Sequence, residues 1–175
     1  MIYQKEFGKK NLLTYKFGNK YIYSYYDPVT EAKRYLSSIK INSKVAITCC
    51  GLDYINRLLL ENGVEEVLSF DPIGFEILDN SPKIKRFKDT DSLELYIKKN
   101  KIDSPQLFIW KELVETDPNL FLAHLKKIKE FIQKETFSNR AASHFGFLES
   151  KNILKNINKL KEIKILKKTN NTITN

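Results

Sequence analysis

Apolar positions follow two spacings along this chain, and each spacing predicts a different element. Short apolar runs, typical of buried parallel strands, cover residues 44–49, 66–71 and 106–110, and alternating polar and apolar residues predict a further strand at residues 83–87. Apolar residues at helical spacing predict helices at residues 28–39, 53–62, 74–79, 91–97 and 117–138. Because strands that alternate with helices are typical of a parallel sheet covered on both faces, we predict a Rossmann-like α/β core over residues 27–138.

An aromatic-rich β-hairpin is predicted ahead of this core, within residues 1–26. Its strands are residues 12–17 and 21–25, and Gly18-Asn19 between them tolerates the positive φ of a tight turn. Seven of the nine tyrosines lie in the first 35 residues. We expect about half of them to pack the hairpin onto the core, and the others to offer a contact surface, since tyrosine combines apolar area with a polar group.

Two segments are predicted after the core. Residues 139–168 form a C-terminal helical extension, in which a loop precedes an amphipathic helix from residue 149 to about residue 166. Residues 169–175 are polar, and we expect them to be a disordered tail.

Composition and charge narrow the class of protein. The chain is 42% hydrophobic and 29% charged, which is typical of a folded domain, and no apolar run is long enough to span a membrane. The two cysteines are neighbours and form no disulfide framework, and the start has no secretory signal pattern, so a reducing cytoplasm is expected. Much of the net charge of +9 comes from seven lysines after residue 150. We interpret this segment as a solvated helix face; nucleic-acid binding is the alternative, although only four of the 30 basic residues are arginine.

The candidate chemistry lies at the turn after the first core strand. Residues 49–54 read Cys-Cys-Gly-Leu-Asp-Tyr, and Asp71 ends the next strand 20 residues after Gly51. In doubly wound folds this turn approaches a ligand, and the acid after the second strand binds a ribose. The candidate pocket residues are therefore Gly51, Asp53, Tyr54 and Asp71. Because the turn has one glycine rather than several, we favour a structural turn with no cofactor, with an S-adenosylmethionine or nucleotide site as the alternative.

The cysteines and histidines predict neither a metal site nor a nucleophile. Neighbouring strand residues point to opposite faces, so Cys49 and Cys50 cannot hold one ion, and we expect both to be buried apolar residues. His124 and His144 are 20 residues apart, outside any metal-binding or catalytic motif. The catalytic residues are therefore left unassigned.

One string of residues is more specific than this chemistry. Residues 23–32 read YSYYDPVTEA, follow the predicted hairpin and precede the turn at residues 49–54. The combination resembles the N-terminal domain of the bacterial motility-associated factor (Maf) proteins, flagellin glycosyltransferases with an S-x-Y-D-P-x-x-E-A signature and then a G-x-G-x-G-Y turn. The matching residues are Ser24, Tyr26, Asp27, Pro28, Glu31 and Ala32 in the signature, and Gly51 and Tyr54 in the turn. Cys49 and Asp53 replace the outer glycines of the turn, and residues 145–146 and 152–156 match more loosely.

The resemblance implies a methyltransferase-like topology, and it implies that catalysis belongs to a different domain. In the family a larger central domain, similar to sialyltransferases, follows and carries the sugar transfer, and its opening motif does not occur before Asn175. The resemblance thus implies a non-catalytic accessory module, with a vestigial nucleotide site at most, in flagellar or surface glycosylation. Its protein partner would be flagellin or a glycosylation enzyme, bound by the tyrosine-rich hairpin and the basic final helix; self-association is left open. A small S-adenosylmethionine-dependent methyltransferase is the enzymatic alternative.

Overall fold

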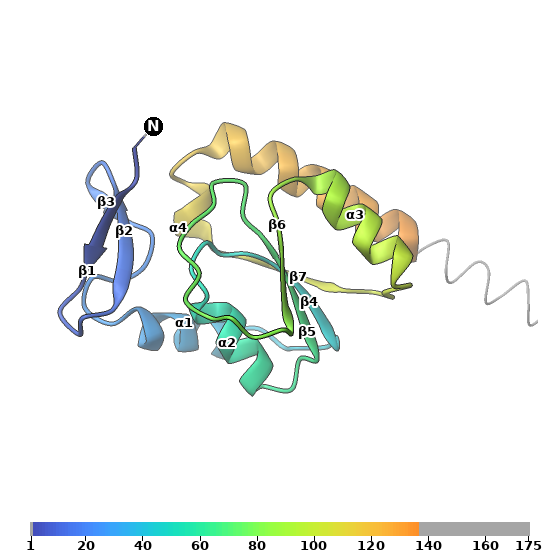
Figure 1. Cartoon of the computed structure of the whole chain (residues 1–175), viewed down its shortest axis with the longest axis horizontal. Coiled ribbons are helices and arrows are strands. Elements are labelled where there is room, and N and C mark those ends of the chain that lie inside the picture. The colour runs from blue at the N-terminus through green and yellow to red at the C-terminus, as the bar shows by residue number, and fades with distance from the viewer. Residues whose placement is uncertain (1, 137–175) are drawn as a thin grey trace, which may run out of the picture. The chain divides into compact units, whose positions relative to one another are not determined.

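The fold combines an antiparallel N-terminal sheet with a parallel sheet flanked by helices (Figure 1). The computed structural model describes residues 2–136, of which residues up to 133 belong to one compact unit. The strands are β1 (Gln4–Phe7), β2 (Leu13–Phe17), β3 (Lys20–Tyr21), β4 (Val45–Cys49), β5 (Glu66–Phe70), β6 (Ile84–Phe87) and β7 (Gln106–Ile109). The helices are α1 (Pro28–Ser37), α2 (Tyr54–Glu61), α3 (Thr90–Lys99), α4 (Lys111–Val114) and an unlabelled helix over residues 118–136.

The central sheet has four strands, all parallel, in the order β6-β5-β4-β7. Thr48 and Ser69 lie side by side on β4 and β5, and both bond to Asn56 of α2 (2.7 and 3.3 Å). Phe70 points to the opposite face, where its ring lies 5.2 Å from that of His124 on the 118–136 helix. Helices therefore cover both faces, as the sequence predicts, with α1 and α2 on one side and α3 on the other (Figure 1).

The ends of the first two core helices follow from local chemistry. Asp27 caps α1 by accepting a hydrogen bond from Thr30 N, and Pro28 occupies the first helical position, where its missing N–H has no helical partner to lose. α2 ends before Gly63, whose φ of +88° few side-chain-bearing residues adopt. The predicted starts of both helices, and all four predicted core strands, are confirmed to within one residue.

The predicted helix at residues 74–79 is wrong. This segment is irregular, because the carboxylate of Asp53 accepts the N–H groups of Leu78 and Asp79, which the carbonyls of residues 74 and 75 would accept in a helix. The helix predicted at residues 91–97 begins one residue earlier, at Thr90, because Asp89 caps it by accepting from Ser92 N at 2.7 Å; Asp91 instead pairs with Lys127.

The N-terminal hairpin has one strand more than predicted, and its last strand is shorter than predicted. β1 adds a third strand to it, giving the order β1-β2-β3. The strand predicted over residues 21–25 ends at Tyr21, because Ile22 and Tyr23 turn into the core and become fully buried.

Several predictions fall on residues that the structure does not describe. These are the loop and helix of the 139–168 extension, the 169–175 tail, His144 and the looser family matches after residue 144. Within residues 2–136 no helix is long and apolar enough to cross a membrane.

Candidate functional site

The candidate site lies at the carboxyl edge of the parallel sheet. Chain order reverses between β4 and β7, since β5 and β6 follow β4 on one side and β7 lies on the other. In open α/β sheets the crevice at such a switch point is where ligands bind. Gly51 follows β4 and Trp110 follows β7, so these two residues mark the crevice.

An aromatic side chain from the N-terminal segment fills this switch point. The ring of Tyr23 stacks on that of Trp110, with centroids 4.7 Å apart and planes 12° apart. The Tyr23 hydroxyl donates to Cys50 O at 2.8 Å, and the Trp110 indole N–H donates to Ile22 O. Tyr23 is 1% exposed, and burial raises the pKa of its hydroxyl well above the usual value, so the group stays a neutral donor. The position that a ligand would take is occupied by the chain itself.

The single glycine of the turn is required by its backbone and by a neighbour. Gly51 has a φ of +70°, and a Cβ on it would lie 3.3 Å from the Phe75 ring. Tyr3 and Tyr15 pack against the other sides of Phe75, with centroids 5.1 and 4.9 Å away. Phe75 therefore covers the turn at the point where the backbone of Gly51 would contact a ligand.

Asp53 is a structural anchor rather than a ligand group. It is 3% exposed, and one carboxylate oxygen accepts from Arg86 Nη2 at 3.0 Å and from Leu78 N at 2.8 Å. The other oxygen accepts from Asn56 Nδ2 at 2.8 Å. Asp53 therefore ties the 71–79 segment and β6 to the start of α2.

Asp71 is likewise engaged by its own loop. Its carboxylate accepts from Ile73 N, Gly74 N and Phe75 N at 3.1, 2.9 and 2.6 Å. Burial raises the pKa of this carboxyl above its usual range, and the three N–H bonds offset that rise only in part. The acid that would hold a ribose mainly holds the connection after β5.

Tyr54 joins α2 to the N-terminal sheet. Its hydroxyl donates to Leu13 O at 2.7 Å, and its ring lies 5.2 Å from that of Tyr23. The structure therefore places Tyr54 beside the filled crevice, as a contact between α2 and the N-terminal sheet.

The signature residues build the connection from the N-terminal sheet to α1. The Ser24 hydroxyl accepts from Tyr26 N and Asp27 N, both at 3.2 Å, and Glu31 accepts from Ser24 N at 2.6 Å. A Lys10 ion pair together with the helix-cap bonds lowers the pKa of the Asp27 carboxyl. Tyr26 differs from the others because it is 62% exposed.

An open space remains at the other half of the carboxyl edge. A cavity of about 300 Å³ lies over the ends of β5 and β6, and its lining includes Asp71, Phe75, Arg86, Phe87 and Lys88. Of the four candidate pocket residues, only Asp71 lines it. Gly51, Asp53 and Tyr54 lie near one another but face packed side chains.

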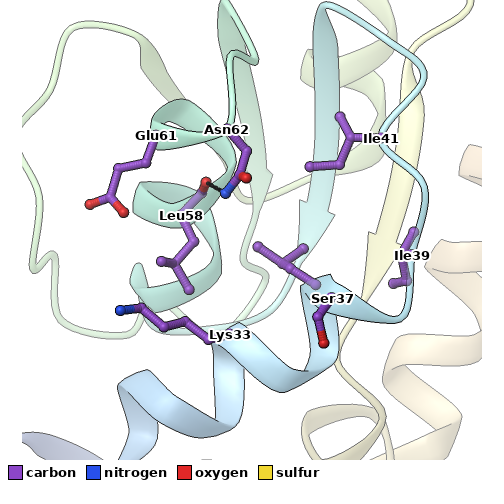
Figure 2. A pocket seen from close by; sticks show the side chains of 8 residues that line it. Lys33, Ser37, Ile39, Ile41, Leu58, Glu61 and Asn62 are labelled. Carbon is purple, nitrogen blue, oxygen red and sulfur yellow. Dashed lines mark hydrogen bonds between the residues drawn. The ribbon is translucent and has the colours of Figure 1, made fainter.

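A second hollow lies between the C-terminal ends of α1 and α2 (Figure 2). This groove of about 540 Å³ has an apolar floor that includes Ile39, Ile41 and Leu58. Asn62 at its wall donates to Leu58 O at 2.7 Å, the dashed line in Figure 2, and the Ser37 hydroxyl donates to Arg34 O. The groove is at the amino end of the strands, away from the edge where such folds bind ligands.

The cysteines are buried, as predicted. Burial raises the pKa of the Cys49 thiol to about 12 and that of Cys50 well above its usual value, so both stay protonated and unreactive at neutral pH. Within residues 2–136, no three His, Cys, Asp or Glu side chains are grouped to hold a metal ion.

Sequence reasoning missed Tyr23, Phe75 and Trp110, which close the crevice, and Arg86, which bonds Asp53. Trp110 could have been found, because the one tryptophan is the last residue of a predicted parallel strand, at the edge where ligands bind. Tyr23 and Phe75 carry no such local signal, since each reaches the crevice from a separate segment.

With this geometry established, comparison with known proteins adds no relative. No family model matches the chain, no curated protein matches it, and no solved structure matches it. The resemblance to the Maf N-terminal domain therefore stays a prediction.

Proposed function

We propose that this chain is a non-catalytic, Rossmann-like module of the Maf N-terminal type, which acts through protein contacts in flagellar or surface glycosylation. The observation that carries the proposal is the Tyr23–Trp110 stack at the switch point of the sheet. A transferase of this fold needs that crevice for its donor. Opening the crevice would expose the buried Tyr23. For comparison, truncating a large aromatic core residue lowers the free energy of unfolding by about 3–5 kcal/mol.

The polar atoms of the crevice support the same proposal. Asp53 bonds Arg86 and the 71–79 segment, and Asp71 bonds its own loop. A catalytic or substrate-binding carboxylate needs an oxygen that faces the substrate. Here both oxygens of Asp53 are engaged within the protein, and Asp71 uses three acceptor positions on the loop that covers the turn.

The N-terminal sheet offers a surface for a protein partner. Tyr3, Tyr15, Tyr23 and Tyr35 contact the α/β core, which matches the expectation that about half of the early tyrosines pack inward. Tyr21, Tyr25 and Tyr26 instead form an outer tyrosine strip, with centroids 5.2 and 6.0 Å apart. Lys16 and Lys9 lie over the rings at its two ends. Tyrosine is enriched at protein interfaces, so the strip is the surface we assign to flagellin or a glycosylation enzyme.

A transfer assay tests the absence of catalysis. The purified chain is incubated with flagellin and either nucleotide-activated sugars or S-adenosylmethionine, and the flagellin mass is measured. We expect no added sugar or methyl group. Transfer by the chain alone would overturn the proposal.

A binding assay tests the contact surface. The double substitution Lys9→Ala and Tyr26→Ala should weaken binding to flagellin or to the glycosylation enzyme, as measured by biolayer interferometry. The matched control is Lys44→Ala with Glu65→Ala, which removes an exposed ion pair at the start of the central sheet. If neither protein binds the unmodified chain, the assigned partners are wrong.

The methyltransferase alternative is favoured by one observation, the cavity beside Asp71. A ligand present at 100 times its dissociation constant stabilises the native state by about 2.7 kcal/mol, which a thermal melt detects. We expect no shift with S-adenosylmethionine or S-adenosylhomocysteine, because Phe75 fills the space beside Gly51. A shift that Asp71→Ala abolishes would favour the methyltransferase.

A further inference from the structure

The cavity over the ends of β5 and β6 has a chemistry that the proposed function does not use. We propose that it binds a mononucleotide, with a planar base against apolar walls and a single phosphate at a cationic rim. This site is separate from the outer tyrosine strip, and the inference does not depend on the chain's protein partners.

The walls of the cavity suit a planar apolar ring. Phe87, the last residue of β6, is half-buried and Phe75 is nearly buried, and both line the space. Ile77 lies at the cavity as well and is 51% exposed, so one side of the lining is open to solvent. Aromatic and aliphatic walls with a few placed polar groups are the usual lining of small-molecule sites.

The charges at the cavity favour an anion. Arg86 is neutralised by its ion pair with Asp53, but no acidic side chain within residues 2–136 pairs with Lys88. The Lys88 ammonium lies 3.8 Å from where a Cβ on Gly74 would stand, and both residues line the cavity. Lys88 is the group we assign to the phosphate.

Asp71 supplies an acceptor for a ribose hydroxyl or a base amino group. A carboxylate has about four lone-pair positions. The backbone N–H groups of Ile73, Gly74 and Phe75 take three of them, and Asp71 lines the cavity. One acceptor position therefore remains for a ligand.

The size of the space limits the ligand to one nucleotide. The cavity of about 300 Å³ is at the lower end of the range for ligand sites. Toward Gly51 it is closed by Phe75, and beyond that Tyr23 fills the switch point. A dinucleotide needs the filled half of the edge, and the cationic sulfonium of S-adenosylmethionine is repelled by Lys88.

The experiment uses the full chain and four probes: adenosine monophosphate, adenosine, inorganic phosphate and S-adenosylmethionine. Isothermal titration calorimetry measures each affinity. We expect adenosine monophosphate to bind most tightly and adenosine to bind about tenfold more weakly, because it lacks the charge-assisted bond to Lys88. Phosphate alone and S-adenosylmethionine should show no measurable binding.

Two lysine variants locate the site. Lys88→Ala should weaken the binding of adenosine monophosphate about tenfold and leave the affinity for adenosine unchanged. Lys83→Ala is the matched control, since Lys83 is an exposed lysine just before β6 that does not line the cavity. Equal losses in the two variants, tighter binding of S-adenosylmethionine, or no binding of adenosine monophosphate would each overturn the proposal. These outcomes leave the protein-contact proposal untouched, because that proposal is tested by flagellin transfer and partner binding.

Discussion

The two halves of the carboxyl edge belong to one sheet yet differ in what covers them. Over β4 and β7, Tyr23 stacks on Trp110 and Phe75 covers Gly51, so the crevice is packed like a core. Over β5 and β6 a cavity of about 300 Å³ remains. The N-terminal segment, through Tyr23, reaches the first half, whereas the second is bounded by the 71–79 segment and β6. The crevice at the switch point of a parallel sheet is thus a ligand site or a packing site, depending on which distant segment lies on it.

The largest expected effect is at the filled half. Tyr23→Ala removes the ring stacked on Trp110 and leaves a cavity, and it should lower the free energy of unfolding by about 3–5 kcal/mol. Urea denaturation followed by tryptophan fluorescence measures the loss. Tyr26→Ala, on the exposed strip, is the control and should change stability by at most about 0.5 kcal/mol. Similar losses in the two variants would contradict the contrast between a packed and an exposed tyrosine.

Asp53→Ala should have the next largest effect. It leaves Arg86, itself partly exposed, and two backbone N–H groups without their acceptor, so we expect a loss of about 3 kcal/mol. Asp53→Asn keeps one acceptor oxygen and should lose less. Chemical denaturation of the three proteins measures the order. A cost for Asp53→Ala below about 1 kcal/mol would show that the ion pair does not hold the segment.

Asp71→Asn should be milder and should depend on pH. At neutral pH the amide leaves Phe75 N without an acceptor, at a cost of about 1–2 kcal/mol. The pKa of Asp71 is raised in the folded state, so its protonated form favours folding at low pH. That contribution is lost as the pH rises from the unfolded pKa through the raised folded pKa.

Denaturation of wild type and Asp71→Asn across this pH range checks the sign. The stability of the wild type relative to the variant should fall as the pH rises through the window. A rise instead would mean that the carboxylate bonds outweigh the cost of burial.

The smallest effect is expected at the open half. Lys88→Ala should leave the free energy of unfolding within about 0.5 kcal/mol, because no acidic partner within residues 2–136 is lost. Thermal melts without ligand measure it. A loss as large as that of Asp71→Asn would show that this half, too, is held by its own side chains.

The secondary structure of the core was predictable because its signals are local. The buried apolar runs of β4 and β5, the Asp27-Pro28 cap and Gly63 each act within a few residues. The helix expected at residues 74–79 failed for the opposite reason. Its N–H groups bond to carboxylates, and Asp53 lies 25 residues before Leu78.

The sequence predicted where the candidate site lies, but not what its residues do. Strand–turn–helix spacing put Gly51, Asp53 and Asp71 at the carboxyl edge, where the structure has them. Spacing cannot show which partners a carboxylate finds, and here Asp53 bonds Arg86, 33 residues later. The connection to α1 behaves differently, because Ser24 bonds Glu31 seven residues later and Asp27 caps α1 through Thr30. The Lys10 ion pair of Asp27, by contrast, spans 17 positions and carries no local signal.

By itself, the sequence determined the alternation of strands and helices, the parallel α/β core and the buried cysteines, since apolar periodicity and capping are properties of neighbouring residues. The tertiary structure decided which half of the sheet edge is filled. That outcome depends on Ile22 and Tyr23 meeting Trp110 across 88 and 87 positions of the chain. Such long-range packing is set by the shape and hydrogen-bonding needs of surfaces that exist only after the core has formed.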